Sequence, residues 1–502
     1  MRPSVLALAT LLAASSLARS AGAQSNYRTA PLGGHSTLMG GTGIAIGRDG
    51  AAAFLNPATI TDIRDTGFAF SAAFLSIKTL SIKNFHKPGS VDQAEFGDIS
   101  LDGTRFTTTK VDLLPSTLCL FVNLSDAKAL NLTHHRLSLC FGTLEREDTS
   151  NLAIGYRGGS SAARVEQGQS FLNSWNRFAA GPAYSGKLSD SLAIGISTYA
   201  IASNLDSLWS GNTSIYSTTG RFLAVSVHNV ASALSLDINS SLGLTYQVNR
   251  TYTLGLTATL PTFHVLGSYA SLYQTQYSGG TDYAFARRGE GGFRASMPAK
   301  IGAGLAAHLP RTHIELNTTF YFPRRQATES TFSKVEELTA LSGQPAVERS
   351  FRATYTTDLQ PVVNTAFGFE YFMRPRLGLL GGTSTSFTSS PPLSTRPEIG
   401  TTAFSRENRL TGSVGFSSYG DSTELVIGVE VSHGWGKTYV LNPFELPNRF
   451  VPIDHSSWGF LLVVAGATNL RSLRATVRNV EEAVKVTPAA GPPKPGPPKP
   501  GP

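Results

Sequence analysis

Residues 252–260 of this chain read Tyr-Thr-Leu-Gly-Leu-Thr-Ala-Thr-Leu, with apolar residues at every second position and Thr or Gly between them. Successive side chains of a strand point to opposite faces, so this segment predicts a strand with one apolar face and one small, polar face. The same alternation recurs in 192–196, 314–322, 365–371 and 425–431. The sequence therefore predicts an all-β protein built from amphipathic strands.

The composition narrows what these apolar faces contact. Charged residues are 15% of the 502 residues, below the roughly 25% typical of soluble globular proteins. After the N-terminus, no run of about 18 apolar residues predicts a membrane-spanning helix. The net charge of +8 is spread along the chain without a basic block, which argues against a nucleic-acid partner. Strands that face lipid fit these observations.

The first 23 residues have the features of a secretory signal peptide. Arg2 supplies a positive start, residues 5–17 an apolar stretch, and Ala21-Gly22-Ala23 a cleavage site before Gln24. A membrane anchor is the alternative, but the apolar run is short and Arg19 interrupts its end. In a bacterium with two membranes, an exported protein with such strands is expected in the outer membrane.

Short and long connections alternate along the chain. The short ones are 123–131, 187–191, 248–251, 310–312, 373–375 and 417–422, and the long polar ones are 79–107, 147–170, 205–234, 263–293, 324–356, 389–401 and 437–455. Outer-membrane barrels have short periplasmic turns and long outer loops. We therefore expect an antiparallel transmembrane β-barrel of about 14 strands within residues 66–470. A soluble β-sandwich would not favour long loops at one end only.

These connections bracket fourteen expected strands: 66–78, 108–122, 132–146, 171–186, 192–204, 235–247, 252–262, 294–309, 313–323, 357–372, 376–388, 402–416, 423–436 and 456–466. Polar residues lie on the inward parity, among them Arg136 and Lys300. Charge on the lipid face would cost about 2–4 kcal/mol for a base at mid-bilayer. A barrel of this size encloses a lumen, so something must plug it.

Residues 39–58, before the first strand, are suited to that role. Five glycines (Gly40, Gly41, Gly43, Gly47 and Gly50) permit tight turns and close backbone contacts. Asn56-Pro57 favours the start of a turn. A compact segment of small residues could fold into the lumen, whereas the alternative is a disordered linker after the signal peptide.

The segment from Gly40 to Ala58, with Asp49, Phe54 and Asn56-Pro57-Ala58, resembles the opening segment of the FadL family of outer-membrane transporters, which includes aromatic-hydrocarbon channels of the TodX type. Residues 187–195 and 114–116 are similar to turns of that family. The resemblance implies a monomeric barrel in outer-membrane lipid with an N-terminal hatch, residues 24–65. The implied hatch residues are Gly43, Asp49, Asn56, Pro57 and Ala58.

The resemblance also implies passive transport of a hydrophobic small molecule, such as a long-chain fatty acid or an aromatic hydrocarbon. In the family, ligand leaves sideways through a gap at a kink of the third strand. Gly142 could permit that kink here, or be an ordinary small inward residue. Arg136 or Lys300 could bind a ligand carboxylate in the lumen, or pair with Glu315 or Glu370. The alternative function is a FadL-like scaffold in protein secretion or envelope assembly.

Cys119 and Cys140 are the two cysteines, and they are symmetric about a turn between the second and third expected strands. They form a disulfide if they are cross-strand neighbours in an oxidising compartment, or remain free thiols if the register is slipped. No metal site is expected. No catalytic or cofactor-binding motif is present, so we expect neither an enzyme nor a cofactor.

The C-terminal residues 471–502 depart from the family pattern. Leu473, Val477, Val480 and Val484 fit a helical stripe, and a repeated Gly-Pro-Pro-Lys-Pro follows. We expect a periplasmic tail that acts as a spacer, or that docks a partner or the cell envelope.

Overall fold

The computed structural model describes residues 27, 29–63, 66–83, 105–124, 134–159, 163–220, 222–279, 282–341, 343, 345–393, 406–421, 423–442 and 449–469. The expected signal peptide (1–23) and tail (471–502) lie outside the described residues, so both remain predictions.

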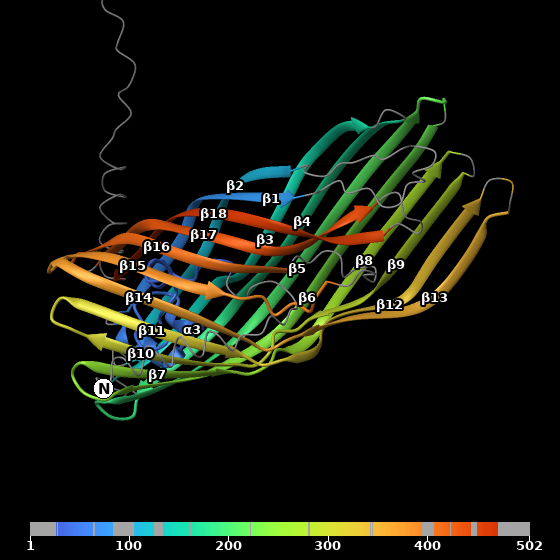
Figure 1. Cartoon of the computed structure of the whole chain (residues 1–502). Coiled ribbons are helices and arrows are strands. Elements are labelled where there is room, and N and C mark those ends of the chain that lie inside the picture. Colours follow the sequence, from blue (N-terminus) through green and yellow to red (C-terminus); the bar gives the residue numbers. More distant parts are fainter. Residues whose placement is uncertain are drawn as a thin grey trace, which may run out of the picture.

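One antiparallel sheet makes up nearly the whole described chain (Figure 1). Its strands are β1 (Gly67–Lys83), β2 (Arg105–Asn123), β3 (His135–Gly159), β4 (Ala163–Lys187), β5 (Leu192–Ser217), β6 (Phe222–Gln247), β7 (Tyr252–Thr259), β8 (Phe263–Ser278), β9 (Tyr283–Ala295), β10 (Lys300–His308), β11 (Thr312–Tyr321), β12 (Arg324–Leu341), β13 (Val347–Leu359), β14 (Val362–Arg374), β15 (Leu377–Ser386), β16 (Arg406–Tyr419), β17 (Thr423–Asn442) and β18 (Arg449–Asn469).

Four pairs of these strands are halves of one crossing each: β7 with β8, β9 with β10, β11 with β12, and β13 with β14. β6, for example, pairs with β7 along one half and with β8 along the other. The eighteen segments therefore form fourteen crossings, and β1 pairs with both β2 and β18, which closes the ring. The prediction of a fourteen-stranded antiparallel barrel is confirmed, and the β-sandwich is excluded.

The prediction of where the strands end was wrong on one side of the barrel. Five stretches expected as loops (147–170, 205–234, 263–293, 324–356 and 437–455) are mostly strand. β5 and β6, for example, remain paired from Leu192↔Tyr246 to Tyr216↔Phe222. Backbone hydrogen bonds hold a ladder together whether or not the outward side chains are apolar, so these stretches stay paired where the sequence alternation lapses.

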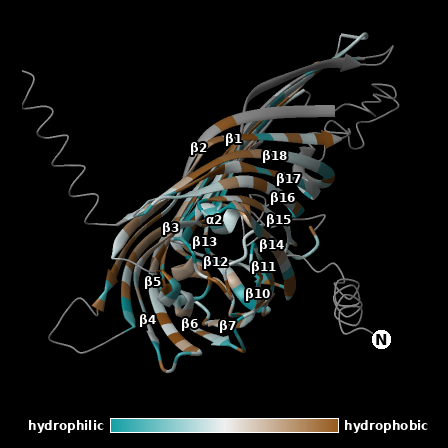
Figure 2. Cartoon of the chain, turned by 90° about the vertical axis from the view of Figure 1, so that its left-hand side faces the viewer, coloured by the Kyte–Doolittle hydropathy of each residue, from teal (hydrophilic) through white to brown (hydrophobic). Residues whose placement is uncertain are grey.

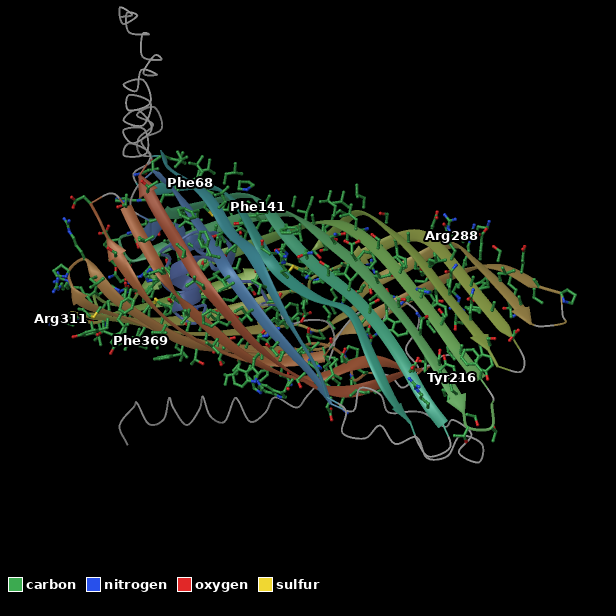
Figure 3. All side chains as sticks on the ribbon, turned by 90° about the horizontal axis from the view of Figure 1, so that it is seen from above. Phe68, Phe141, Tyr216, Arg288, Arg311 and Phe369 are labelled. Atoms are coloured by element: carbon green, nitrogen blue, oxygen red, sulfur yellow. A yellow bond between two sulfur atoms is a disulfide. The ribbon has the colours of Figure 1, made fainter. Side chains whose placement is uncertain are left out.

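Side-chain parity follows the predicted pattern. On β7, Leu254 and Leu256 are 42% and 51% exposed, whereas Gly255 between them and Thr257 after them are buried. Large apolar side chains such as Phe141 lie on the outer surface (Figure 3). Figure 3 also places Arg311 at the end with the short turns and Arg288 toward the opposite end.

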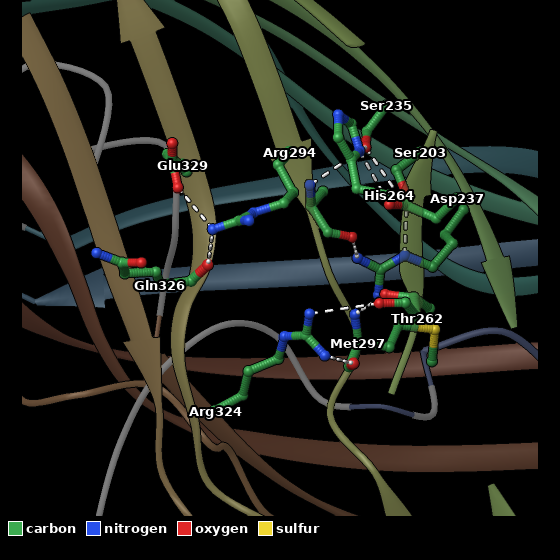
Figure 4. A network of polar contacts seen from close by, with 12 residues as sticks. Ser203, Ser235, Asp237, Thr262, His264, Arg294, Met297, Arg324, Gln326 and Glu329 are labelled. Atoms are coloured by element: carbon green, nitrogen blue, oxygen red, sulfur yellow. Dashed lines mark hydrogen bonds and ion pairs between the residues drawn. The ribbon is translucent and has the colours of Figure 1, made fainter. Parts of the chain in front are cut away.

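Prolines mark the interrupted crossings: Pro261, Pro298, Pro323 and Pro361 each lie between the two halves of a crossing. Because proline has no N–H to donate, it interrupts a ladder. Side chains replace some of the lost bonds (Figure 4). Arg324 of β12 donates to the carbonyl oxygens of Thr262 (3.3 Å) and Met297 (3.1 Å). These acceptors lie in the gaps of the β7/β8 and β9/β10 crossings, so one side chain links the two gaps.

Residues 29–63, here called the N-terminal segment, fold inside the ring. The segment contains α2 (Gly34–Leu38), α3 (Ala52–Leu55) and η1 (Pro57–Asp62). Its residues are nearly all buried, and α2 lies within the ring when the barrel is seen end-on (Figure 2). It occupies the end with the short turns (Figure 1). Among the described residues, no helix has the length and hydropathy of a membrane-spanning helix.

Candidate functional site

Asn56 organises the N-terminal segment. Its side-chain oxygen accepts a hydrogen bond from the Ala58 amide (3.1 Å), which caps η1, and Pro57 takes the first helical position, where no N–H is needed. Its amide nitrogen donates to the carbonyl oxygens of Ile44 (2.6 Å) and Leu244 (3.2 Å). Leu244 belongs to β6, so one side chain joins the segment to the wall.

Asp49 holds the two halves of the segment together. Its carboxylate accepts hydrogen bonds from the amides of Ser36 (3.1 Å) and Ala51 (2.9 Å). Burial raises the pKa of the Asp49 carboxyl, while the nearby His35 charge and these two amides oppose the rise. Gly43 has φ +146°, a conformation that disfavours any residue with a side chain.

Wall glycines allow the segment to approach. A Cβ added at Gly243 would lie 2.0 Å from the Asn56 side-chain oxygen, and one at Gly255 would lie 2.0 Å from the Ile44 carbonyl oxygen. Gly195 approaches the Pro57 backbone and Gly368 the Met39 backbone in the same way. Small inward residues therefore create the space that the segment fills.

Two buried wall carboxylates bind the segment. Glu315 on β11 accepts hydrogen bonds from the amides of Gly43 (3.0 Å) and Ala45 (2.8 Å). Glu370 on β14 is 0% exposed; it pairs with Arg48, and its second oxygen accepts hydrogen bonds from the hydroxyl groups of Ser417 (2.8 Å) and Tyr419 (2.6 Å). The sequence offered Glu315 and Glu370 as partners of an inward base, but both bind the N-terminal segment instead.

His35 in α2 completes this ionic cluster. Its ring nitrogens lie 3.0 Å from Glu424 and 3.5 Å from Glu370. Burial lowers the pKa of His35, but hydrogen bonds and attraction to Glu370 and Glu424 outweigh it and raise the pKa to about 9. His35, Arg48, Glu370 and Glu424 thus form a latch, our name for these four residues, between the segment and the wall.

Sequence reasoning missed His35 and Arg48 as site residues. Arg48 is one of only two charged residues in the small-residue segment 39–58, which is a signal that could have indicated a buried partner. His35 carries no comparable signal, because its partners on β14 and β17 are more than 330 residues away in sequence.

Beyond the segment, the inner face of the barrel carries an apolar, aromatic cluster together with buried ion pairs. One buried cluster contains Trp175, Leu205, Ala231, Ala233, Tyr269, Phe293, Ala295, Phe332 and Val335. The edge of Phe332 meets Tyr269 at a ring-centroid distance of 5.1 Å. Beside this cluster, Arg177 forms a buried ion pair with Glu145 (2.7 Å), and Trp175 donates to the same carboxylate (2.9 Å).

Lys300 and Arg136 lie in different parts of the barrel. The Lys300 ammonium is 5.9 Å from the ring of Tyr321, on which Tyr27 is stacked with a centroid distance of 4.1 Å. Arg136 lies at the short-turn end of β3. Burial raises the pKa of Asp62 in the N-terminal segment to about 6, and the positive charge of Arg136 is one of those that oppose this rise. The structure therefore does not bring the two bases to one site.

The ladder of paired residues between β2 and β3, here called the seam, is short. The two strands are paired from Asn123↔Arg136 to Thr117↔Gly142. Beyond Gly142 β3 bulges between Thr143 and Glu145 and follows β4 alone, while β2 follows β1. Gly142 thus lies where the wall splits. A Cβ there would lie 2.8 Å from the Phe54 ring of the N-terminal segment.

The N-terminal segment bridges this split. The amide of Arg146 on β3 donates to the Thr29 hydroxyl oxygen (2.8 Å), and the Ser116 hydroxyl on β2 donates to the Pro31 carbonyl oxygen. Below the split, Cys119 and Cys140 are opposite each other in register and are joined by a disulfide. Residues 29–31 therefore connect two edges that no ladder joins in the described chain.

A cavity of about 950 Å³ lies at the short-turn end, on the other side of the N-terminal segment. Its lining includes Arg48, Asp49, Asp62, Lys187 and Glu424. This vestibule has a mixed lining, in which apolar side chains such as Phe68, Phe121 and Phe372 stand beside the charged ones, and the segment lies between it and the lumen cluster.

Comparisons with known proteins reveal structural likeness only. No protein-family description and no curated protein matches the sequence. The structure is similar to that of the Pseudomonas putida toluene transporter TodX, with 16% identity, a TM-score of 0.50, and coverage of 89% of this chain and 100% of that one. A Pseudomonas aeruginosa FadL homologue has 12% identity, a TM-score of 0.50, and coverage of 89% and 100%. These likenesses establish a shared fold.

Proposed function

We propose that this protein lies in the outer membrane and passes hydrophobic small molecules, such as long-chain fatty acids or aromatic hydrocarbons, by facilitated diffusion without chemistry. The observation that carries the proposal is the split between β2 and β3 in a barrel whose inner face bears an apolar, aromatic cluster. The shared fold of a toluene transporter and a FadL homologue supports it.

The path begins among the aromatic side chains of the lumen. An apolar ligand that buries about 200 Å² of its surface there gains about 5 kcal/mol at roughly 25 cal/mol per Å². The ligand then meets the N-terminal segment, and the split between β2 and β3 offers a sideways exit into lipid. Gly142, at the margin of this split, is the last residue of β3 that pairs with β2.

In this proposal the N-terminal segment is the movable part of a hatch, residues 24–65. The latch and Glu315 hold it against the wall, and residues 29–31 bridge the exit. A ligand that displaces residues 29–31 and shifts the rest of the segment would open the split, while the shifted segment still separates the lumen from the vestibule.

Uptake of radiolabelled toluene and oleate into proteoliposomes tests the function. The full chain should carry both faster than protein-free vesicles, and it should not release a trapped hydrophilic dye. A variant without residues 29–58 should release the dye. If hydrophobic uptake does not exceed that of protein-free vesicles, the transport proposal is wrong. If the shortened variant retains the dye, the hatch is wrong.

A further inference from the structure

The disulfide between Cys119 and Cys140 lies close to the point where the barrel wall splits. It is two residues from Thr117↔Gly142, the last pair before the wall splits. Seven residue pairs join β2 to β3, from Thr117 to Asn123, whereas twenty-five join β5 to β6. A short ladder frays from its end more readily than a long one, because each opened pair leaves fewer to hold the seam.

Both cysteines also pack in one buried cluster with the N-terminal segment, which is the movable part of the proposed hatch. Cys119 and Cys140 are 1% and 2% exposed and belong to the buried cluster that contains Ala52 and Phe54 of the N-terminal segment. The Cys119 sulfur is 3.5 Å from the Gly50 carbonyl oxygen. Displacement of the segment would therefore remove packing from this seam at the point where the ladder is weakest.

We propose that the disulfide is a staple that limits how far the exit can open. When the N-terminal segment moves, the split widens on the outer side of Thr117↔Gly142, and the covalent link keeps the wall below it closed. The ligand is thereby directed into lipid and does not reach the vestibule along an opening seam. The inference rests on the proposed function, since it assigns the split seam as the exit.

Hydrogen exchange measured by mass spectrometry tests the staple without any transport assay. In the full chain in nanodiscs, Cys119→Ser/Cys140→Ser should exchange residues 117–123 and 136–142 at least tenfold faster than wild type. Exchange of the β5–β6 seam should not change. Unchanged exchange at 117–123 in the folded double variant would overturn the proposal.

A relocated link separates covalent stapling from the packing of the thiols. Phe121 and Ser138 are opposite each other in the same seam, so Phe121→Cys/Ser138→Cys added to the double serine variant should restore slow exchange. Failure of the oxidised relocated link to do so would also overturn the proposal. If the serine variant does not fold, reduction and alkylation of the folded wild type gives the same comparison.

Transport assays then separate the test of the staple from the test of the proposed function. If wild type carries toluene, the unstapled protein should additionally release a trapped hydrophilic dye during toluene flux, and the relocated link should stop the release. Retention of the dye by the unstapled protein would reject the directing role. If wild type carries neither toluene nor oleate, the proposed function fails, whereas the exchange result still decides whether the seam is stapled.

Discussion

Removal of Glu370 should release the N-terminal segment. Glu370→Ala leaves Arg48 without its carboxylate and takes one of the two acidic partners from His35. Deleting one member of a buried ion pair costs about 3–5 kcal/mol, because the other charge stays buried without compensation. If that cost falls on the docked state, the open population rises by about two to three and a half orders of magnitude.

Hydrogen exchange of residues 40–56 measures this opening directly, and single-channel conductance in planar bilayers reports whether the lumen becomes continuous. The matched control is Glu407→Ala. Glu407 is also a buried carboxylate, but it pairs with His455 (3.1 Å) and Arg409 (2.6 Å), both in the wall. Glu370→Ala should accelerate exchange in 40–56 far more than Glu407→Ala. Equal effects of the two variants would refute the latch.

Three further predictions concern the same interface. Gly243→Ala should displace Asn56 and lower the thermal unfolding temperature, because the added Cβ would lie 2.0 Å from the Asn56 side-chain oxygen. Gly412→Ala, which has open space around the added Cβ, should leave the unfolding temperature unchanged. Equal melting curves of the two variants would contradict the close-approach argument. The pKa of His35 is raised to about 9, because attraction to its acidic partners outweighs burial. The protonated ring therefore stabilises docking fully below pH 6.5, and this stabilisation is lost as the pH rises through about 9. Conductance should therefore rise between pH 7 and 10 in wild type but not in His35→Gln, and a flat wild-type profile would exclude the switch. Asn56→Ala removes the η1 cap and the bond to Leu244, which should destabilise docking by about 1–3 kcal/mol; trypsin cleavage at Arg48 should accelerate, and an unchanged cleavage rate would argue against a role for Asn56.

Local alternation was enough to identify the strands. The number of crossings followed from the alternation of short and long connections, and the period of two in segments such as 252–260 indicated which side chains face inward. The symmetry of Cys119 and Cys140 about their turn left two alternatives, a disulfide or a slipped register with free thiols, and the structure has the disulfide. The far ends of the strands could not be located, because in 205–234 and 324–356 the apolar residues at outward positions give way to polar ones such as Asn212 and Thr331, although inward residues such as Phe332 remain apolar.

Tertiary structure decided the site. The sequence placed Glu315, Glu370, Lys300 and Arg136 on inward parity, but parity does not say which inward groups share a level or face one another. That depends on the stagger of the strands and on the path of residues 29–63 through the ring. Glu370 therefore binds Arg48 and His35 rather than an inward base of the wall. Charges in a closed barrel meet across its bore, where proximity is independent of separation along the chain.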